Sequence, residues 1–375
     1  MQYFRRIPYT SLGFRLALVS FFFNISIETS SIFLPLRARS LGASDLEVGL
    51  IAASYGMAYF VSSFLFGRQS DMRGRMAFIR YGLALSALAY IIQIFAPTPL
   101  TLLASRGVIG FSLGVSSAAL MAYVYEAGGA VGSFASYGSL GWFFGALIAA
   151  ATRNIEWLFI TSAVAAAIAF LISLTLREEA VSRIKVTVFP LGVVWSNRKI
   201  YLPFLLRHIG ATAVWSMFAL YLSGIGASTL WIALMDVLNM GGQFLAMQFL
   251  QRFNAIRIFT LGLVCSVLVF AIYGIATHYL QLIPVQIVLA VAWSGLFVGA
   301  LNYLLAKNVE RGTAVGLLYS TASLAGGIGP FLGGAISEVW GFPTLMFASS
   351  GISFVGLLAS RGLGSKTGKR RVQKE

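Results

Sequence analysis

The chain has 375 residues, of which 58% are hydrophobic and only 10% are charged, and its mean hydropathy is +0.84. Soluble domains are typically about half apolar and a quarter charged. A water-soluble fold is therefore excluded, because too few charges remain to cover its surface. The net charge of +15 does not indicate nucleic-acid binding, because the basic residues lie in short gaps between apolar segments and not on a face interleaved with aromatic side chains.

Twelve apolar stretches are long enough to cross a bilayer as helices, which needs about 20 residues each. They lie near 12–36, 44–66, 77–96, 99–124, 131–151, 155–176, 200–223, 227–250, 256–277, 281–305, 313–336 and 341–361. The longest gap, 177–199, is rich in charge and contains Pro190. We expect an all-α membrane protein with an N-terminal six-helix bundle (1–176), a linker (177–199) and a C-terminal six-helix bundle with a short basic tail (200–375).

The basic residues are distributed unevenly between the two sides of the membrane that these spans define. Of the 27 Lys and Arg residues, 21 fall in the gaps or at the span ends on the side of the two termini, 3 on the opposite side and 3 deeper within spans. Because cytoplasmic loops carry an excess of Lys and Arg, both termini are predicted to be cytoplasmic. We expect a multi-pass protein of the plasma membrane whose basic residues contact anionic lipid headgroups.

The two halves of the sequence resemble each other at an ungapped offset of 184 residues. Gly42-Ala43-Ser44 matches Gly226-Ala227-Ser228, and Ala130-Val131-Gly132 matches Ala314-Val315-Gly316. Glu126 falls on Glu310 at the same offset. This pattern predicts two parallel repeats related by an axis along the membrane normal, an arrangement typical of transporters.

The gap after the second stretch reads Gly67-Arg68-Gln69-Ser70-Asp71-Met72-Arg73-Gly74-Arg75. Its acid lies among arginines, and Gly74 allows a turn with positive φ. In spacing and position the segment resembles the G-x-x-x-D-x-x-G-R loop of the major facilitator superfamily, between helices two and three. The resemblance implies a twelve-helix transporter in which Asp71 helps to latch the two halves in the outward-open state. The residues of this expected conformational latch are Gly67, Asp71, Arg73, Gly74 and Arg75.

Small residues and a proline form a second pattern, in helix five and in its repeat mate, helix eleven. We expect them to allow close helix packing, at Gly141, Gly145, Gly329, Pro330, Gly333 and Gly334. Antiporters of the superfamily carry G-x-x-x-G-P-x-x-G-G in helix five, whereas alanines here replace the proline and the last glycines. Helix four contains Arg106 and Gly110, which is similar to the R-x-x-x-G pattern of the same antiporters.

The sequence contains no ATP-binding loop and no metal-ligand spacing, and its two histidines support no hydrolase motif. We therefore expect neither an enzyme nor a bound cofactor or metal.

Ionisable side chains at membrane depth are functional candidates, because burying them is costly. Glu28 lies seven residues before Pro35 and Arg106 seven residues after Pro99, so both lie about 10 Å below the outer boundary at 1.5 Å per residue. The superfamily resemblance places helices one, four, seven and ten around a cavity, and we expect Glu28 and Arg106 to pair across it. Glu28 is the first candidate for proton coupling and Asp236 the second. The predicted substrate cavity comprises Asn24, Glu28, Arg106, Arg207, His208, Trp215, Trp293 and Asn302.

These patterns favour a secondary transporter that works by alternating access, in the form of proton-coupled export of an amphiphilic compound. One alternative is a facilitative or proton-coupled carrier of an organic anion, which would use Arg106 and Arg207, or of a sugar-like metabolite. Another is a non-transporting membrane sensor or lipid-handling protein. The expected partners are a small-molecule substrate, protons and the lipid bilayer, and we expect a monomer.

Overall fold

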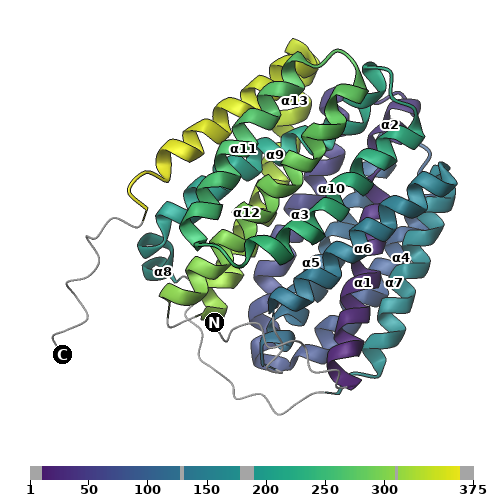
Figure 1. Ribbon diagram of the computed structural model, residues 1–375. Coiled ribbons are helices and arrows are strands. Elements are labelled where there is room, and N and C mark those ends of the chain that lie inside the picture. Colours follow the sequence, from purple (N-terminus) through teal and green to yellow (C-terminus); the bar gives the residue numbers. More distant parts are fainter. Residues whose placement is uncertain (1–10, 127–130, 178–189, 309–310, 364–375) are drawn as a thin grey trace.

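The computed structural model describes residues 11–126, 131–177, 190–308 and 311–363, and within these ranges it contains helices and no strands. The helices run roughly alongside one another in a single bundle (Figure 1). Their bounds are α1 Ser11–Ser31, α2 Leu34–Ser40, α3 Asp45–Arg73, α4 Arg75–Ile94, α5 Pro99–Glu126, α6 Val131–Thr152, α7 Ile155–Leu174, α8 Leu191–Ser196, α9 Arg198–Gly224, α10 Thr229–Leu250, α11 Ala255–Ile275, η1 Tyr279–Leu282, α12 Ile283–Lys307 and α13 Arg311–Ala359.

Ten helices in the described residues are long and apolar enough to cross a membrane. The first combines α1 and α2, and α13 contains two spans because its backbone bends at Gly341, where φ is 78°. The apolar part of α6, Tyr137–Thr152, is shorter. Counting α13 twice and adding α6 gives the twelve predicted spans.

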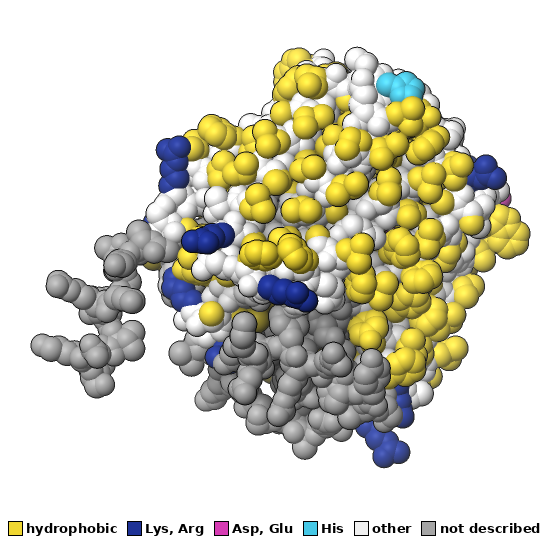
Figure 2. Space-filling model, viewed as in Figure 1, with side chains coloured by type: hydrophobic (Ala, Val, Ile, Leu, Met, Phe, Trp, Pro, Cys, Tyr) yellow, Lys and Arg dark blue, Asp and Glu magenta, His cyan; other side chains and the backbone are white. Residues whose placement is uncertain are grey.

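Large hydrophobic side chains cover the outside of the bundle. Figure 2 shows them spread over the helical face in view. Phe95, Leu245 and Trp157 are among the exposed ones. In a soluble protein such a surface would aggregate, but the hydrocarbon of a bilayer can cover it.

The segment between the second and third spans is more helical than its glycines suggested. We expected a loop from Gly67, but α3 continues to Arg73 and only Gly74 leaves the helical conformation. Gly74 has φ 97° and ψ 152°, which a residue with a side chain rarely adopts. Gly67 stays helical because an isolated glycine only weakens a helix.

The predicted repeat is visible in the backbone. Gly42 and Gly226, 184 positions apart, have φ values of 89° and 90°. The N–H of Ala43 donates to the carbonyl of Ala38 at 3.0 Å, and the N–H of Ala227 donates to that of Leu222 at 2.9 Å. The same turn therefore closes the first span of each half. The repeat mates Glu126 and Glu310 cannot be compared, because Glu310 and the side chain of Glu126 lie outside the described residues.

The two ends of the bundle differ in how the halves meet. One end, here called the α2 end, carries α2 and the turns at Gly42 and Gly226, whereas the other, the α8 end, carries α8 and the turn at Gly74 (Figure 1). Contacts between the halves run mainly along α3 with α13 and α6 with α10.

The hydrophobic clusters that combine both halves lie towards the α2 end, for example Ile32 and Phe33 with Val214 and Tyr273. The other clusters among the described residues each belong to one half. The halves are therefore joined at the α2 end.

Candidate functional site

Glu28 lies on α1 where Gly145 of α6 packs against it. The Glu28 side chain is 7% exposed. A Cβ added to Gly145 of α6 would lie 2.7 Å from the Cβ of Glu28. One turn earlier, Asn24 accepts a hydrogen bond of 2.5 Å from the indole Nε1 of Trp142. Gly141 packs on the same face of α1, against the carbonyl of Phe21. The glycines of α6 therefore leave the room that these polar side chains occupy.

Arg106 lies on α5 and is 3% exposed. Its terminal nitrogens donate to the hydroxyls of Ser30 at 2.7 Å and Ser31 at 3.2 Å. Its guanidinium carbon lies 4.5 Å from the ring centroid of Tyr55, a cation–π contact. The Nε of Arg106 has no hydrogen-bond partner.

The expected ion pair between Glu28 and Arg106 is not formed, and this prediction was wrong for this conformation. In the described residues the one ion pair joins Arg39 to Asp45. The positions of the two residues along their helices predict their depth in the membrane but not the directions in which their side chains point. Ser30, which binds Arg106, lies two positions after Glu28 and thus about 200° around a helix of 3.6 residues per turn. Glu28 faces α6, whereas Arg106 reaches the other side of α1.

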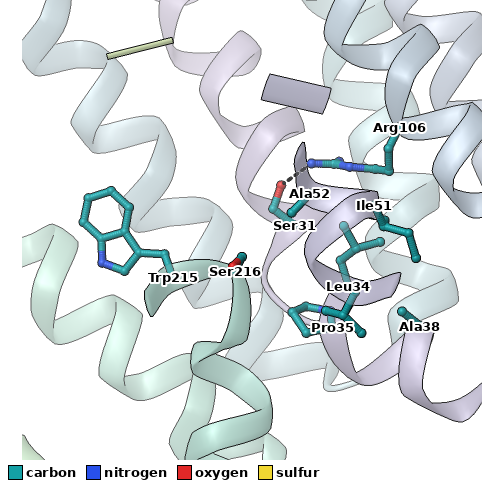
Figure 3. A pocket seen from close by; sticks show the side chains of 10 residues that line it. Ser31, Leu34, Pro35, Ala38, Ile51, Ala52, Arg106, Trp215 and Ser216 are labelled. Atoms are coloured by element: carbon teal, nitrogen blue, oxygen red, sulfur yellow. Dashed lines mark hydrogen bonds between the residues drawn. The ribbon is translucent and has the colours of Figure 1, made fainter. Parts of the chain in front are cut away.

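A cavity of about 100 Å³ lies between the halves at Arg106 (Figure 3). Ser31, Leu34 and Arg106 line it from the first half, and Trp215 and Ser216 line it from the second. At roughly 30 Å³ per water molecule it has room for about three waters. It is too small for an organic solute, as expected where the halves are closed.

Arg207 lies on α9 and is fully buried, with 0% exposure. Its Nε donates to the hydroxyl of Ser266 on α11 at 2.8 Å. Both terminal nitrogens lack a hydrogen-bond partner. The guanidinium carbon lies 5.5 Å from the ring centroid of Trp293, 5.7 Å from that of Phe270 and 5.8 Å from that of Trp215.

His208 joins the aromatic side chains beside Arg207 into one cluster. Its ring stacks on Trp293 with centroids 5.0 Å apart and meets Trp215 edge-on at 5.5 Å. The Nδ1 of His208 is buried and has no partner. The cluster, defined by His208, Trp215 and Trp293, continues to the cavity because Trp215 also lines it.

Asp236 lies on α10, the helix of the second half that packs on α6. Its carboxylate is within electrostatic reach of Glu28, which belongs to the first half. On the next turn, Asn239 accepts a hydrogen bond of 2.5 Å from Gln243 and donates to the carbonyl of Gln286 at 3.3 Å. The two acids predicted for proton coupling therefore interact electrostatically, with Glu28 on α1 against α6 and Asp236 on α10, which also packs on α6.

The remaining predicted residues lie elsewhere. Asn302 is half-buried on α12. In the expected latch, Arg73 is exposed, the buried Arg75 donates to the hydroxyl of Ser70 at 3.3 Å, and a Cβ on Gly67 would lie 3.4 Å from that of Ala118. The side chain of Asp71 lies outside the described residues.

The glycines of α13 contact two different helices. Gly329 and Gly333 pack on α9, at Ile209 and Ala213. Gly334 and the carbonyl of Pro330 pack on α3 at Gly49, across the contact between the halves.

Sequence reasoning missed two buried polar side chains of α4. Tyr90 and Gln93 of α4 are 0% and 1% exposed, and the Tyr90 hydroxyl and both polar atoms of the Gln93 side chain lack partners. Their spacing of three residues on one helical face was the available signal.

The sequence matches the family model described as Major Facilitator Superfamily over residues 16–309. No curated protein matches the chain. Similar solved structures include the nucleoside transporter NupG, with TM-score 0.74 and 15% identity over 94% of this chain and 98% of that chain. A mutant of NupG has TM-score 0.75 and 15% identity over 92% and 98%. The human organic anion transporter MFSD10 has TM-score 0.73 and 18% identity over 93% and 98%.

Proposed function

The chain belongs to the Major Facilitator Superfamily, and we propose that this membrane transporter carries a small amphiphilic organic compound by alternating access in exchange for protons. Export is the direction we favour, because the fourth span, α5, carries the antiporter-like pair Arg106 and Gly110. The similar structures transport nucleosides in one case and organic anions in another. At their low identity this likeness concerns the fold and does not select a substrate.

Alternating access requires two conformations in which opposite ends of the bundle are closed. Clusters that combine both halves at the α2 end, and clusters confined to one half elsewhere, support the view that the structure is one of these two conformations. In this proposal the protein lies in the plasma membrane with both termini in the cytoplasm. The closed α2 end would then face outwards. Linker 177–199 would then join two bundles, 1–176 and 200–375, that rock against each other.

The observation that carries the proton-coupling proposal is the position of two acids, Glu28 in the first half and Asp236 in the second, within reach of each other. Two ionised carboxylates that interact electrostatically repel each other, and a proton on either removes the repulsion. Protonation of either acid would therefore favour closure of the α6–α10 contact, and loss of the proton would favour its opening. A difference in proton affinity between the two conformations is what couples proton binding to the conformational change.

A second candidate function is transport of an organic anion, favoured by the two unpartnered terminal nitrogens of Arg207. In that case the acids would still carry the proton, and the anion would neutralise the buried arginine.

The experiment uses purified full-length protein in proteoliposomes with an imposed pH gradient and a panel of radiolabelled amphiphilic acids, bases and neutral compounds. The proposal expects accumulation of at least one compound that stops when an ionophore collapses the gradient. Equal uptake with and without the gradient for every transported compound would contradict the coupling. Glu156→Gln, which neutralises an exposed acid outside this site, is the control for the variants discussed below.

A further inference from the structure

We propose that the C-terminal half holds an anion site centred on Arg207, which binds the carboxylate of a flat aromatic acid while the ring packs on the cluster of His208, Trp215 and Trp293. This inference rests on the proposed transport function and names the class of its substrate. Four features of the described residues carry it.

The first feature is an unsatisfied buried charge. Arg207 is 0% exposed and both terminal nitrogens lack hydrogen-bond partners. No carboxylate in the described part of the chain lies within ion-pair distance of it, since the ion pair found there joins Arg39 to Asp45. A buried guanidinium is costly unless its donors are paired, so the arrangement suits a bound anion.

The second feature is the orientation of the guanidinium. Its Nε donates to the Ser266 hydroxyl at 2.8 Å, and that hydroxyl donates in turn to the carbonyl of Gly262 at 2.7 Å. The side chain is thus held from behind, on α11. The two free terminal nitrogens are a pair that can bind both oxygens of one carboxylate.

The third feature is the aromatic surroundings. Trp215 and Trp293 each have a ring centroid within 6 Å of the guanidinium carbon, at 5.8 and 5.5 Å. Flat, polarisable rings of this kind receive a planar ligand by offset or edge-on stacking. The free Nδ1 of His208, next to Trp293, is a further group that can bond to a polar substituent.

The fourth feature is a connection to the contact between the halves. Trp215 forms part of the cavity wall opposite Arg106 (Figure 3). Trp215 and Trp293 are both half-buried, whereas Arg207 is fully buried behind them. A ligand that enters between the halves therefore meets the aromatic rings first and the positive charge next.

The charge of Arg207 also selects against other solutes. A cation with the same ring would be repelled, and a neutral amide could accept hydrogen bonds but not neutralise the charge. Arg106 is a weaker candidate, because its two terminal nitrogens already bond to Ser30 and Ser31.

The test is a binding assay on the purified full chain in detergent with benzoate, benzamide and benzylammonium, which share one ring and differ in charge. Tryptophan fluorescence and thermal stability are the readouts. Benzoate is expected to quench fluorescence saturably and to raise the Tm, with the other two compounds weaker by about tenfold or more. Equal responses to all three would overturn the anion site.

Variants locate the site. Arg207→Gln is expected to weaken benzoate binding by about tenfold or more, whereas Arg207→Lys should retain part of it. Trp293→Phe should remove much of the quenching. Arg257→Gln, which removes an exposed arginine from the same half, should leave the affinity unchanged.

If Arg207→Gln does not fold, Ser266→Ala takes its place. It frees the Nε of Arg207 without removing the charge, and it should weaken benzoate binding several-fold. Unchanged benzoate affinity in the folded Arg207→Gln protein, or in Ser266→Ala when that variant replaces it, would overturn the proposal.

Binding in detergent requires neither a proton gradient nor a change between conformations. If benzoate binds through Arg207 but no compound is accumulated, the transport proposal fails and the anion site stands. If a different solute is accumulated with the proton gradient and Arg207→Gln has no effect on it, the anion site fails and the transport proposal stands.

Discussion

Glu338, near the end of the first span of α13, accepts a hydrogen bond of 3.2 Å from the backbone N–H of Leu46, in the first turn of α3. The bond joins the second half to the first at the α2 end. The first N–H groups of a helix have no partner within the helix, and a carboxylate there is also favoured by the helix dipole. Arg39 pairs with Asp45 beside it and offsets the acidic first turn of α3.

Replacing this carboxylate should favour opening of the α2 end. Glu338→Gln keeps an acceptor but loses the charge, so the closed conformation should lose part of its stabilisation. Spin labels at the exposed positions Ser40 and Ser223, one in each half, would measure the distance across the α2 end in a Cys265→Ser background. We expect a larger population of long distances in the variant. An unchanged distribution would show that Glu338 does not hold the closed conformation.

The close backbone contact between α3 and α13 gives a second prediction. A Cβ added to Gly56 would collide with the backbone of Gly326, whereas one added to Gly107 would meet nothing within 4 Å. Gly56→Ala should therefore destabilise the closed conformation by about 1–3 kcal/mol, the usual cost of overpacking, while Gly107→Ala should not. Thermal unfolding of the two purified variants compares them directly. Equal Tm values would mean that the halves do not approach this closely.

The orientation in the membrane rests on the distribution of Lys and Arg. Reporter domains fused after residues 190 and 375 should both be located in the cytoplasm, because 21 of the 27 basic residues lie on that side. A periplasmic or extracellular signal from either fusion would reverse the assignment of the α2 end.

Asp71 is the acid of the segment that resembles the superfamily loop. Because this segment follows the second predicted span, Asp71 is expected to lie far from the middle of the membrane. Asp71→Asn should slow turnover while the KM stays within about threefold, because the residue would change the balance between conformations and not touch the solute. Transport rates in proteoliposomes, with Glu156→Gln as the control, would measure this. Wild-type turnover in Asp71→Asn would leave the segment with a role in topology only.

The sequence predicted the helices and the repeat well because both depend on local properties. Spans follow from length and hydropathy, and the shared turns at Gly42 and Gly226 follow from a motif repeated at a fixed offset. Side-chain direction depends on packing between helices that are distant in the chain. Depth alone could not show that Glu28 faces Gly145 of α6 while Arg106 bonds to Ser30.

The surroundings of Arg207 could not be predicted from the sequence for the same reason. Ser266 and Trp293, which contact its guanidinium, come from α11 and α12. The residue type indicated a functional candidate at membrane depth, but only the packing of three helices shows that its terminal nitrogens remain unpartnered.

The most direct test of proton coupling through Glu28 is accumulation of a transported compound against its gradient by Glu28→Gln in proteoliposomes, compared with exchange of the same compound at equal concentrations. Glutamine mimics the protonated acid and cannot release a proton, so the variant should exchange the compound but no longer accumulate it when a pH gradient is applied. Asp236→Asn, on the other side of the α6–α10 contact, should weaken accumulation in the same assay. Gradient-driven accumulation by Glu28→Gln at the wild-type level would contradict the account.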